Sequence, residues 1–312
     1  MEGITVKKSD VEMTRTTHAS HLLLALTSLY LVWGSTYLAI AIAVQSLPPL
    51  LMAALRFLVA GSLMLLVLRV LGTSLPTRRQ WLGATAVGTL LLLGGNGTVC
   101  LVAHVVPSSV VALVIACTTL AMVLVGWAAG GPRPTLRLSI SIVIGLVGVA
   151  VLVWDPHASW PTWAVLALLF AALSWAAGSV LSKRLGMAWQ IPSPWMATAA
   201  HMLAGGAVML IAVTVRGEWA AASLAIVTQA SALAWAYLVV AGSIVGFGSY
   251  VWLLRNASPA LATSYGYVNP LVAIVLGAWL HQEPITAQTL TAGGVILLSV
   301  ALIATAPRHA GG

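Results

Sequence analysis

The chain has 312 residues, of which 60% are hydrophobic and only 6% are charged, and its formal net charge is +8. A soluble domain carries about 25% charged residues to keep its surface in water, so this composition excludes an ordinary water-soluble fold. A positive net charge can indicate nucleic-acid binding. The basic residues are not clustered on one soluble segment, however, and we expect no nucleic-acid partner.

Long apolar runs recur along the whole chain after a polar N-terminal tail at residues 1–20. The first run, Leu22 to Val44, is too long for the hydrophobic region of a signal peptide, so we expect a retained helix. A bilayer core about 30 Å thick needs about 20 apolar residues of helix. The runs therefore predict an all-α integral membrane protein with ten transmembrane helices, at residues 21–44, 50–71, 81–103, 108–128, 138–154, 161–182, 195–215, 232–254, 260–280 and 287–306.

The placement of basic residues tests this assignment independently. With the N-terminus inside, the inner segments hold twelve of the 14 Lys and Arg residues. The outer segments hold only Arg216, and Arg56 falls within the second span. Positive charge concentrates on the cytoplasmic side of membrane proteins, so the pattern predicts that both termini are cytoplasmic.

The chain also reads as two similar halves, which we expect at residues 21–155 and 160–306, followed by a tail at 307–312. Trp33 opens a stretch similar to that at Trp175, and Pro107 has a counterpart in Pro259. Each half holds five spans, so the two halves must enter the membrane from opposite sides and form an inverted repeat. Such repeats are typical of secondary transporters, whose solute sites lie between the halves.

Polar residues inside predicted spans are costly in lipid and are the first candidates for function. Arg56 could bind a solute or could extend its charged end to the membrane surface. His201 could face a solute or bond to a neighbouring helix, and Asn96 lies among glycines that loosen its helix. The Asn269-Pro270 pair predicts a bend, because proline removes an intrahelical hydrogen bond; packing alone is the alternative.

Aromatic residues near the middle of spans are the second group of candidates. We expect some of them to line a cavity for an amphipathic or aromatic solute, with ordinary packing as the alternative; they are Trp33, Trp175, Tyr250, Tyr265 and Tyr267.

Several kinds of chemistry leave no trace in the sequence. There is no P-loop and no metal-binding motif, so we expect neither an enzyme nor a cofactor. No carboxylate lies inside a predicted span, which favours rocking of the two halves without an obligatory proton. Proton coupling is the alternative, and it would need His201, or Glu283 if the ninth helix dips inward.

Four segments together resemble one known family. They are Leu31-Val32-Trp33-Gly34-Ser35-Thr36-Tyr37, Leu55-Arg56-Phe57, Gly95-Asn96-Gly97 and the run from Ser258 to Thr286, which includes Tyr265, Asn269 and Pro270. They are similar to the drug/metabolite transporter superfamily, and within it to the EamA-type exporters of the bacterial inner membrane. The resemblance implies a ten-helix, two-repeat exporter with a cavity lined by the first, third, fourth, sixth, eighth and ninth helices, and it adds Tyr37 to the cavity candidates.

Two departures from the family pattern affect the fourth helix. Cys117-Thr118-Thr119 stands where a proline is common, and Gly130-Gly131-Pro132 replaces a Gly-Glu turn. Symmetric bending of the fourth and ninth helices is therefore not expected from the sequence.

Taken together, the sequence predicts a secondary transporter of the inner membrane that exports small metabolites, amino acids or drugs by alternating access, with Pro270 as a gating residue. Its expected partners are a small-molecule substrate and the lipid bilayer, and the chain is expected to be a monomer or homodimer. A passive channel or a non-transporting membrane subunit is the alternative, although no span shows the polar stripe of a channel.

Overall fold

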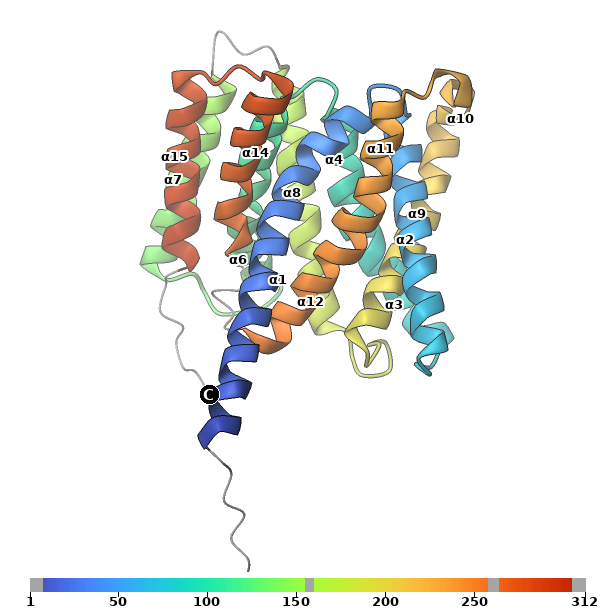
Figure 1. Ribbon diagram of the computed structural model, residues 1–312. Coiled ribbons are helices and arrows are strands. Elements are labelled where there is room, and N and C mark those ends of the chain that lie inside the picture. The colour runs from blue at the N-terminus through green and yellow to red at the C-terminus, as the bar shows by residue number, and fades with distance from the viewer. Residues whose placement is uncertain (1–7, 155–159, 258–263, 305–312) are drawn as a thin grey trace, which may run out of the picture.

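A computed structural model describes residues 8–154, 160–257 and 264–304, and within these ranges every regular element is a helix. The helices stand side by side as upright rods and form a bundle (Figure 1). Lipid offers no hydrogen-bond partner to the backbone, so helices that satisfy their own N–H and C=O groups are the expected solution.

The first half contains a long first helix followed by helices that reverse direction at each connection. Its elements are α1 (Lys8–Ala43), α2 (Pro49–Val70), α3 (Arg78–Gly88), the π-helix η1 (Thr89–Gly97), α4 (Thr98–Val102), α5 (Ser108–Ala116), α6 (Thr118–Ala128) and α7 (Leu136–Val153). The predicted N-terminal tail is therefore helical from Lys8 onward.

The second half repeats this order of long, interrupted and short helices. Its elements are α8 (Thr162–Arg184), α9 (Pro194–Arg216), α10 (Glu218–Ala221), the 3₁₀ turn η2 (Leu224–Ile226), α11 (Gln229–Tyr237), the π-helix η3 (Leu238–Val245), α12 (Gly246–Asn256), α14 (Tyr265–His281) and α15 (Ala287–Ala304). Residues 260–263 of the predicted ninth span lie outside the described residues.

Most helices begin where the sequence provides a start signal. Thr77 and Gln80 form a reciprocal capping box at α3, and the Ser193 hydroxyl accepts the Met196 N–H at α9. Prolines begin α2 and precede α5, which suits the first turn because its N–H groups have no intrahelical partner. These signals explain why the observed helix limits fall close to the predicted ones.

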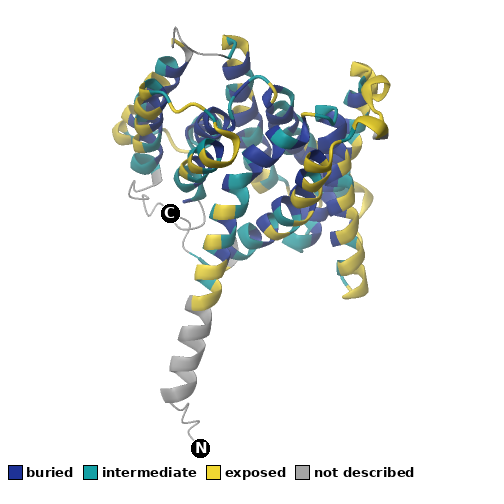
Figure 2. Cartoon of the chain, turned by 45° about the horizontal axis from the view of Figure 1, so that its top comes forward, coloured by how far each residue is buried: buried dark blue, intermediate teal, exposed yellow. Residues whose placement is uncertain are grey.

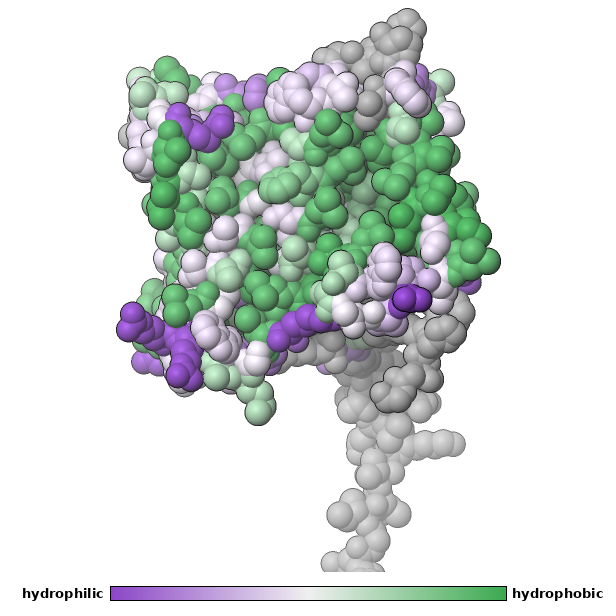
Figure 3. Space-filling model, turned by 180° about the vertical axis from the view of Figure 1, so that it is seen from behind, coloured by the Kyte–Doolittle hydropathy of each residue, from purple (hydrophilic) through white to green (hydrophobic). Residues whose placement is uncertain are grey.

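Among the described residues, seven helical segments are long and apolar enough to cross a membrane, and two further apolar helices are shorter. The seven are Ser20–Ala43, Pro49–Val70, Arg78–Val102, Ser108–Ala128, Thr162–Arg184, Pro194–Arg216 and Gln229–Leu253, and the shorter two are Leu136–Leu152 and Ala287–Ile303. Large apolar side chains such as Leu66 and Val275 point outward, each about 60% exposed. The resulting belt is broad, with polar side chains gathered near its upper and lower edges (Figure 3). The chain is therefore a multi-pass membrane protein.

Small residues bring the helices into close contact, as expected where lipid removes the hydrophobic drive for association. A Cβ atom added to Gly34 of α1 would lie 2.6 Å from the Val272 Cβ of α14. One added to Gly206 of α9 would lie 3.0 Å from Leu58 of α2. The buried residues gather between the helices, and the exposed residues cover the outer faces (Figure 2).

The contacts between helices pair the two halves in a reciprocal way. α1 packs against α14 and α12, while α8 packs against α6 and η1. α2 packs against α9, and α7 packs against α15. Each half thus places its first helix against elements of the other half, and the space between α1 and α8 is left for a cavity.

Candidate functional site

A cavity of about 800 Å³ occupies the centre of the bundle. This volume lies within the range of sites that hold drug-sized molecules. Its walls come from the six helical rods that the family resemblance implies, with single side chains from α2, α7 and α15 in addition. Eight of the predicted site residues line it: Trp33, Tyr37, Arg56, Asn96, Trp175, Tyr265, Asn269 and Pro270.

Trp33 of α1 is held at the cavity wall by the π-helix of the opposite half. Its indole Nε1 donates to the Gly242 carbonyl at 3.2 Å. A Cβ added to Gly246 would lie only 2.3 Å from this nitrogen, so only glycine permits the approach. The Trp33 ring also packs edge-on against Tyr265 and Phe247 at centroid distances of 5.1 and 5.2 Å. These contacts fix one aromatic wall of the cavity.

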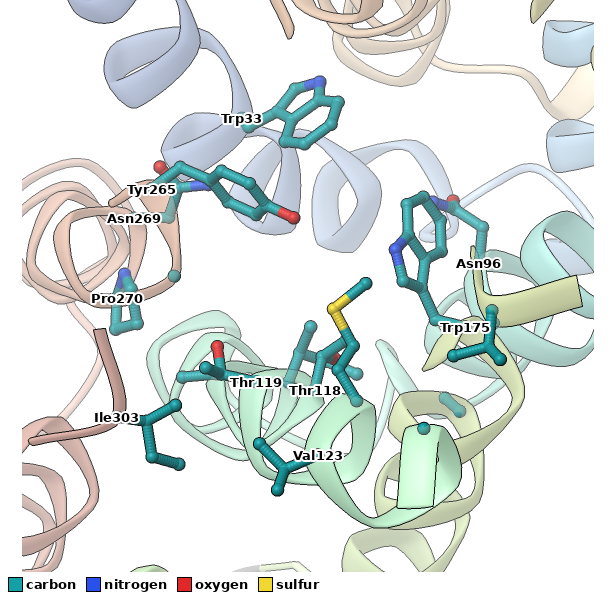
Figure 4. A pocket seen from close by; sticks show the side chains of 18 of the residues that line it. Trp33, Asn96, Thr118, Thr119, Val123, Trp175, Tyr265, Asn269, Pro270 and Ile303 are labelled. Atoms are coloured by element: carbon teal, nitrogen blue, oxygen red, sulfur yellow. The ribbon is translucent and has the colours of Figure 1, made fainter. Parts of the chain in front are cut away.

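Trp175 of α8 occupies the corresponding position on the first π-helix. A Cβ added to Gly95 would lie 3.0 Å from the Trp175 ring, and Ser174 donates to the Leu90 carbonyl at 2.8 Å. The loosening expected around Asn96 takes the form of the π-helix η1, and such segments are frequent at functional sites. Asn96 lies beside Trp175, across an open space from Tyr265 and Asn269 (Figure 4).

Two amide oxygens at the cavity have no partner among the described residues. The Oδ1 atoms of Asn96 and Asn269 are both buried and make no hydrogen bond there. A buried polar atom without a partner costs about 1–3 kcal/mol. Because both residues line the cavity, a bound solute with a hydrogen-bond donor can remove this cost.

The fourth rod is interrupted without a proline. α5 ends at Ala116 and α6 begins at Thr118, because the Cys117 N–H bonds to the Val114 carbonyl three residues earlier at 3.0 Å. By contrast, α14 continues as a helix through Pro270. The interruption lies at the cavity wall, where Thr118 and Thr119 face the open space (Figure 4). The hydrophobic pattern of the sequence did not identify Thr118 and Thr119 as cavity residues. The only sequence signal was that residues 117–119 depart from the family pattern, in which a proline is common.

The cavity reaches one end of the molecule, which we call the basic end. This end carries Arg69, Arg78, Arg79, Arg133, Arg137, Lys183 and Arg184, and lies at the bottom of Figure 1. Arg133, Lys183 and Arg184 are exposed and line the mouth of the cavity. Arg184 also donates to the Ala129 carbonyl, which ties α8 to the end of α6. Sequence reasoning had used these residues only as topology markers.

At the opposite end, which we call the capped end, two carboxylates bond to helix N-termini. Glu283 accepts hydrogen bonds from the Ser108 N–H at 2.8 Å and from the Ser109 N–H and hydroxyl at 3.1 and 2.8 Å. It thereby joins the turn after α14 to the N-terminus of α5, where a negative charge is stabilised by the helix dipole. No described residue of the capped-end connections lines the cavity.

Glu218 makes a similar cap elsewhere at this end. One carboxylate oxygen accepts the Leu50 and Leu51 N–H groups of α2 at 2.9 and 3.0 Å, and the other lies 3.5 Å from Arg216. The residues before these glutamates, Gly217 and Gln282, both have left-handed backbone angles (φ of 71° and 52°) that turn the chain. Glu218 joins α9 to α2, and no α9 side chain lines the cavity.

Three predicted site residues do not line the cavity. Tyr250 lies behind its aromatic wall, with ring centroids 5.3 Å from Trp33 and 5.6 Å from Tyr265. Tyr267 packs against the main hydrophobic core. His201 lies on α9, and its backbone carbonyl is next to α3, where a Cβ added to Gly88 would lie 2.5 Å from that oxygen. Neither candidate for proton coupling, His201 or Glu283, contacts the cavity.

Comparison with known proteins agrees with this architecture. A model of the EamA-like transporter family matches residues 20–154 and again residues 162–305. The chain is 41% identical over 280 residues to the "Uncharacterized inner membrane transporter YedA" of Escherichia coli K12, which covers 89% of each chain. It is 24% identical to a "Probable amino-acid metabolite efflux pump" of the same organism, over 86% of this chain and 89% of that one.

A protein of known crystal structure shares the fold, with a TM-score of 0.63 at 20% identity over 92% of this chain and 97% of the other. The two family matches cover nearly the whole sequence. The chain therefore belongs to the EamA-like transporter family and is a multi-pass protein of the inner membrane.

Proposed function

We propose that this protein is a secondary transporter that exports small solutes by alternating access through the central cavity. The observation that carries the proposal is the asymmetry of the cavity, which opens at the basic end and is closed at the capped end. The positive-inside tendency assigns the basic end to the cytoplasm, so the cavity faces inward. A membrane enzyme is disfavoured by the family and by the names of its members.

The proposal includes ten membrane crossings arranged as two inverted repeats, with both termini cytoplasmic. Three described apolar helices are short of the usual span, namely α7, α14 and α15, and each stands upright beside longer helices of the bundle (Figure 1). Support for the repeat comes from the paired tryptophans, since Trp33 packs on η3 and Trp175 packs on η1. Reporter fusions test the topology: Arg78, Lys183 and Arg308 should read cytoplasmic, and Glu218 should read external.

The proposed cycle needs two conformations of comparable free energy that expose the cavity to opposite sides. Opening of the capped end requires α5 to separate from the turn after α14, and this breaks the Glu283 bonds. Because the cavity wall holds no titratable carboxylate among the described residues, we propose that no proton is obligatory. His201→Ala should accordingly leave transport unchanged in the presence and absence of an imposed pH gradient.

A counterflow screen with the purified protein in liposomes tests the function. Liposomes are preloaded with one unlabelled compound from a panel of small carboxylates, amino acids, nucleosides and cationic drugs, and uptake of the labelled compound is followed. A transporter gives transient accumulation that saturates, while a channel gives simple equilibration. The proposal is contradicted if every compound that crosses the membrane simply equilibrates without transient accumulation. It is also contradicted if no compound crosses.

A further inference from the structure

Arg56 of α2 is a buried cation at the cavity wall. Its side chain is only 2% exposed, so the guanidinium does not extend to the membrane surface, which the sequence had left open. The Nε atom donates to the Ser243 hydroxyl at 2.9 Å, and the guanidinium carbon lies 4.9 Å from the Phe57 ring centroid. The Nη1 atom is buried and has no hydrogen-bond partner among the described residues.

Among the described residues, no carboxylate forms an ion pair or a hydrogen bond with this guanidinium. The acidic residues are Glu2, Asp10, Glu12, Asp155, Glu218 and Glu283. Glu218 and Glu283 are bonded to helix N-termini at the capped end. Glu12 precedes Trp33 on α1 by a distance of roughly 30 Å at 1.5 Å per residue. Glu2 and Asp155 lie outside the described residues.

A charge held in the membrane without a counterion is expensive and is usually retained because it acts on a solute or ion. Guanidinium is planar and presents several N–H donors in a fixed fork, which matches the two oxygens of a carboxylate. Ser243 and Phe57 position this fork but carry no charge. The described part of the site therefore holds a cation with no anion bonded to it, and a buried guanidinium nitrogen there has no hydrogen-bond partner.

We propose that Arg56 binds the carboxylate of the transported solute, and that the protein accordingly prefers carboxylate-bearing solutes to neutral or cationic ones. The inference rests on the proposed transport function. A Cβ added to Gly242 would lie 3.0 Å from Nη2 of Arg56, and the Gly242 carbonyl accepts the Trp33 indole N–H. A carboxylate on Arg56 thus places the rest of the solute beside the aromatic wall of Trp33, Phe247 and Tyr265.

The test compares three probes of one shape: phenylacetate, phenylacetamide and phenethylamine. Each competes in liposomes against a compound found by the counterflow screen. The wild type should be inhibited by phenylacetate at a concentration at least about tenfold lower than by the other two, as expected for a charge-assisted hydrogen bond. Arg56→Gln should abolish this preference. Arg56→Lys retains the positive charge but not the forked N–H donors of guanidinium, so this variant should prefer phenylacetate less strongly than the wild type does.

The matched control is Arg69→Gln, since Arg69 lies on the same helix but is exposed and bonds only to the Thr73 carbonyl. It should behave as the wild type does. Thermal unfolding of each purified variant verifies folding; Arg56→Gln removes an uncompensated buried charge and should not lower the unfolding temperature.

The possible results separate this inference from the proposed function. Equal inhibition of the wild type by all three probes, or a carboxylate preference that survives in Arg56→Gln, overturns the role of Arg56 and leaves transport intact. Should Arg56→Gln fail to fold, a weaker carboxylate preference in Arg56→Lys than in Arg69→Gln decides in favour, and an equal preference in the two variants decides against. A screen in which no compound moves contradicts both proposals.

Discussion

The two ends of the molecule differ in the sign of their charged residues and in whether those residues are hydrogen-bonded or exposed. At the capped end, carboxylates of Glu218 and Glu283 bond to the N-termini of helices far away in the sequence and hold neighbouring rods together. At the basic end, Arg133 and Lys183 are exposed around the mouth of the cavity. From this difference we infer that the Glu283 hydrogen bonds contribute to closure of the capped end, since they join two helices that line the cavity.

The two glutamates differ in what they join. Glu283 connects α14 to α5, and both helices line the cavity. Glu218 connects α9 to α2, which pack tightly on each other away from the cavity apart from Arg56. We therefore expect Glu283 to seal the cavity and Glu218 only to stabilise helix packing, and substitution of each residue tests this difference.

The largest effect is expected from Glu283→Gln. The amide keeps the shape but loses the charge that the α5 N-terminus stabilises, a loss of about 1–2 kcal/mol. That loss shifts the balance between inward-open and outward-open conformations by about 5- to 30-fold. Labelling of a cavity cysteine by an impermeant thiol reagent added from outside measures the shift. Unchanged labelling would show that Glu283 does not seal the cavity.

Glu218→Gln is the matched control for that variant. The loss of a similar cap should lower the free energy of unfolding by about 1 kcal/mol. Outside labelling of the same cavity cysteine should stay at the wild-type level, since α9 contributes no side chain to the cavity. Increased labelling in this variant would mean that the whole capped end acts as one unit.

A smaller effect is expected at Pro270 of α14, the predicted gating residue. Pro270→Ala restores a backbone N–H in α14, and one additional hydrogen bond of about 1 kcal/mol would stiffen the helix. The turnover rate should then fall by about fivefold, while the solute concentration that half-saturates equilibrium binding stays the same. Initial rates and equilibrium binding of one solute distinguish these quantities. Equal loss of both, or of neither, argues against a gating role for Pro270.

The smallest effect is expected at the mouth. Replacement of both Arg133 and Lys183 by Gln removes positive charge that attracts an anionic solute. The initial rate should fall by about twofold at low ionic strength, and the difference should disappear near 1 M salt, where the screening length is about 3 Å. A salt-independent loss would indicate a direct contact with the solute instead.

The sequence anticipated the fold better than the details of closure. Helix limits were predictable because local residues set them, as at the Thr77 capping box and at Ser193. Several aromatic and amide residues of the cavity wall were also predictable, since such residues are uncommon within apolar runs. Eight of the eleven named residues line the cavity.

Long-range contacts account for what was missed. The bonds from Glu283 to Ser108 and Ser109 join residues about 175 positions apart, and nothing local to either segment signals them. The interruption at Cys117 exposes Thr118 and Thr119, but those residues also fit a continuous helix. Whether His201 faces α3 or the cavity depends on how α9 is rotated, and its uniform apolar surroundings do not fix that rotation.

One measurement tests the central claim, that the cavity opens to the cytoplasm and is closed on the other side. Ile115 of α5 lines the cavity and is replaced by Cys in a Cys100→Ala, Cys117→Ala background. An impermeant thiol reagent is then added to inside-out and to right-side-out vesicles. We predict rapid labelling from the cytoplasmic side and at most slow labelling from the outside. Equal or faster labelling from the outside would contradict the account.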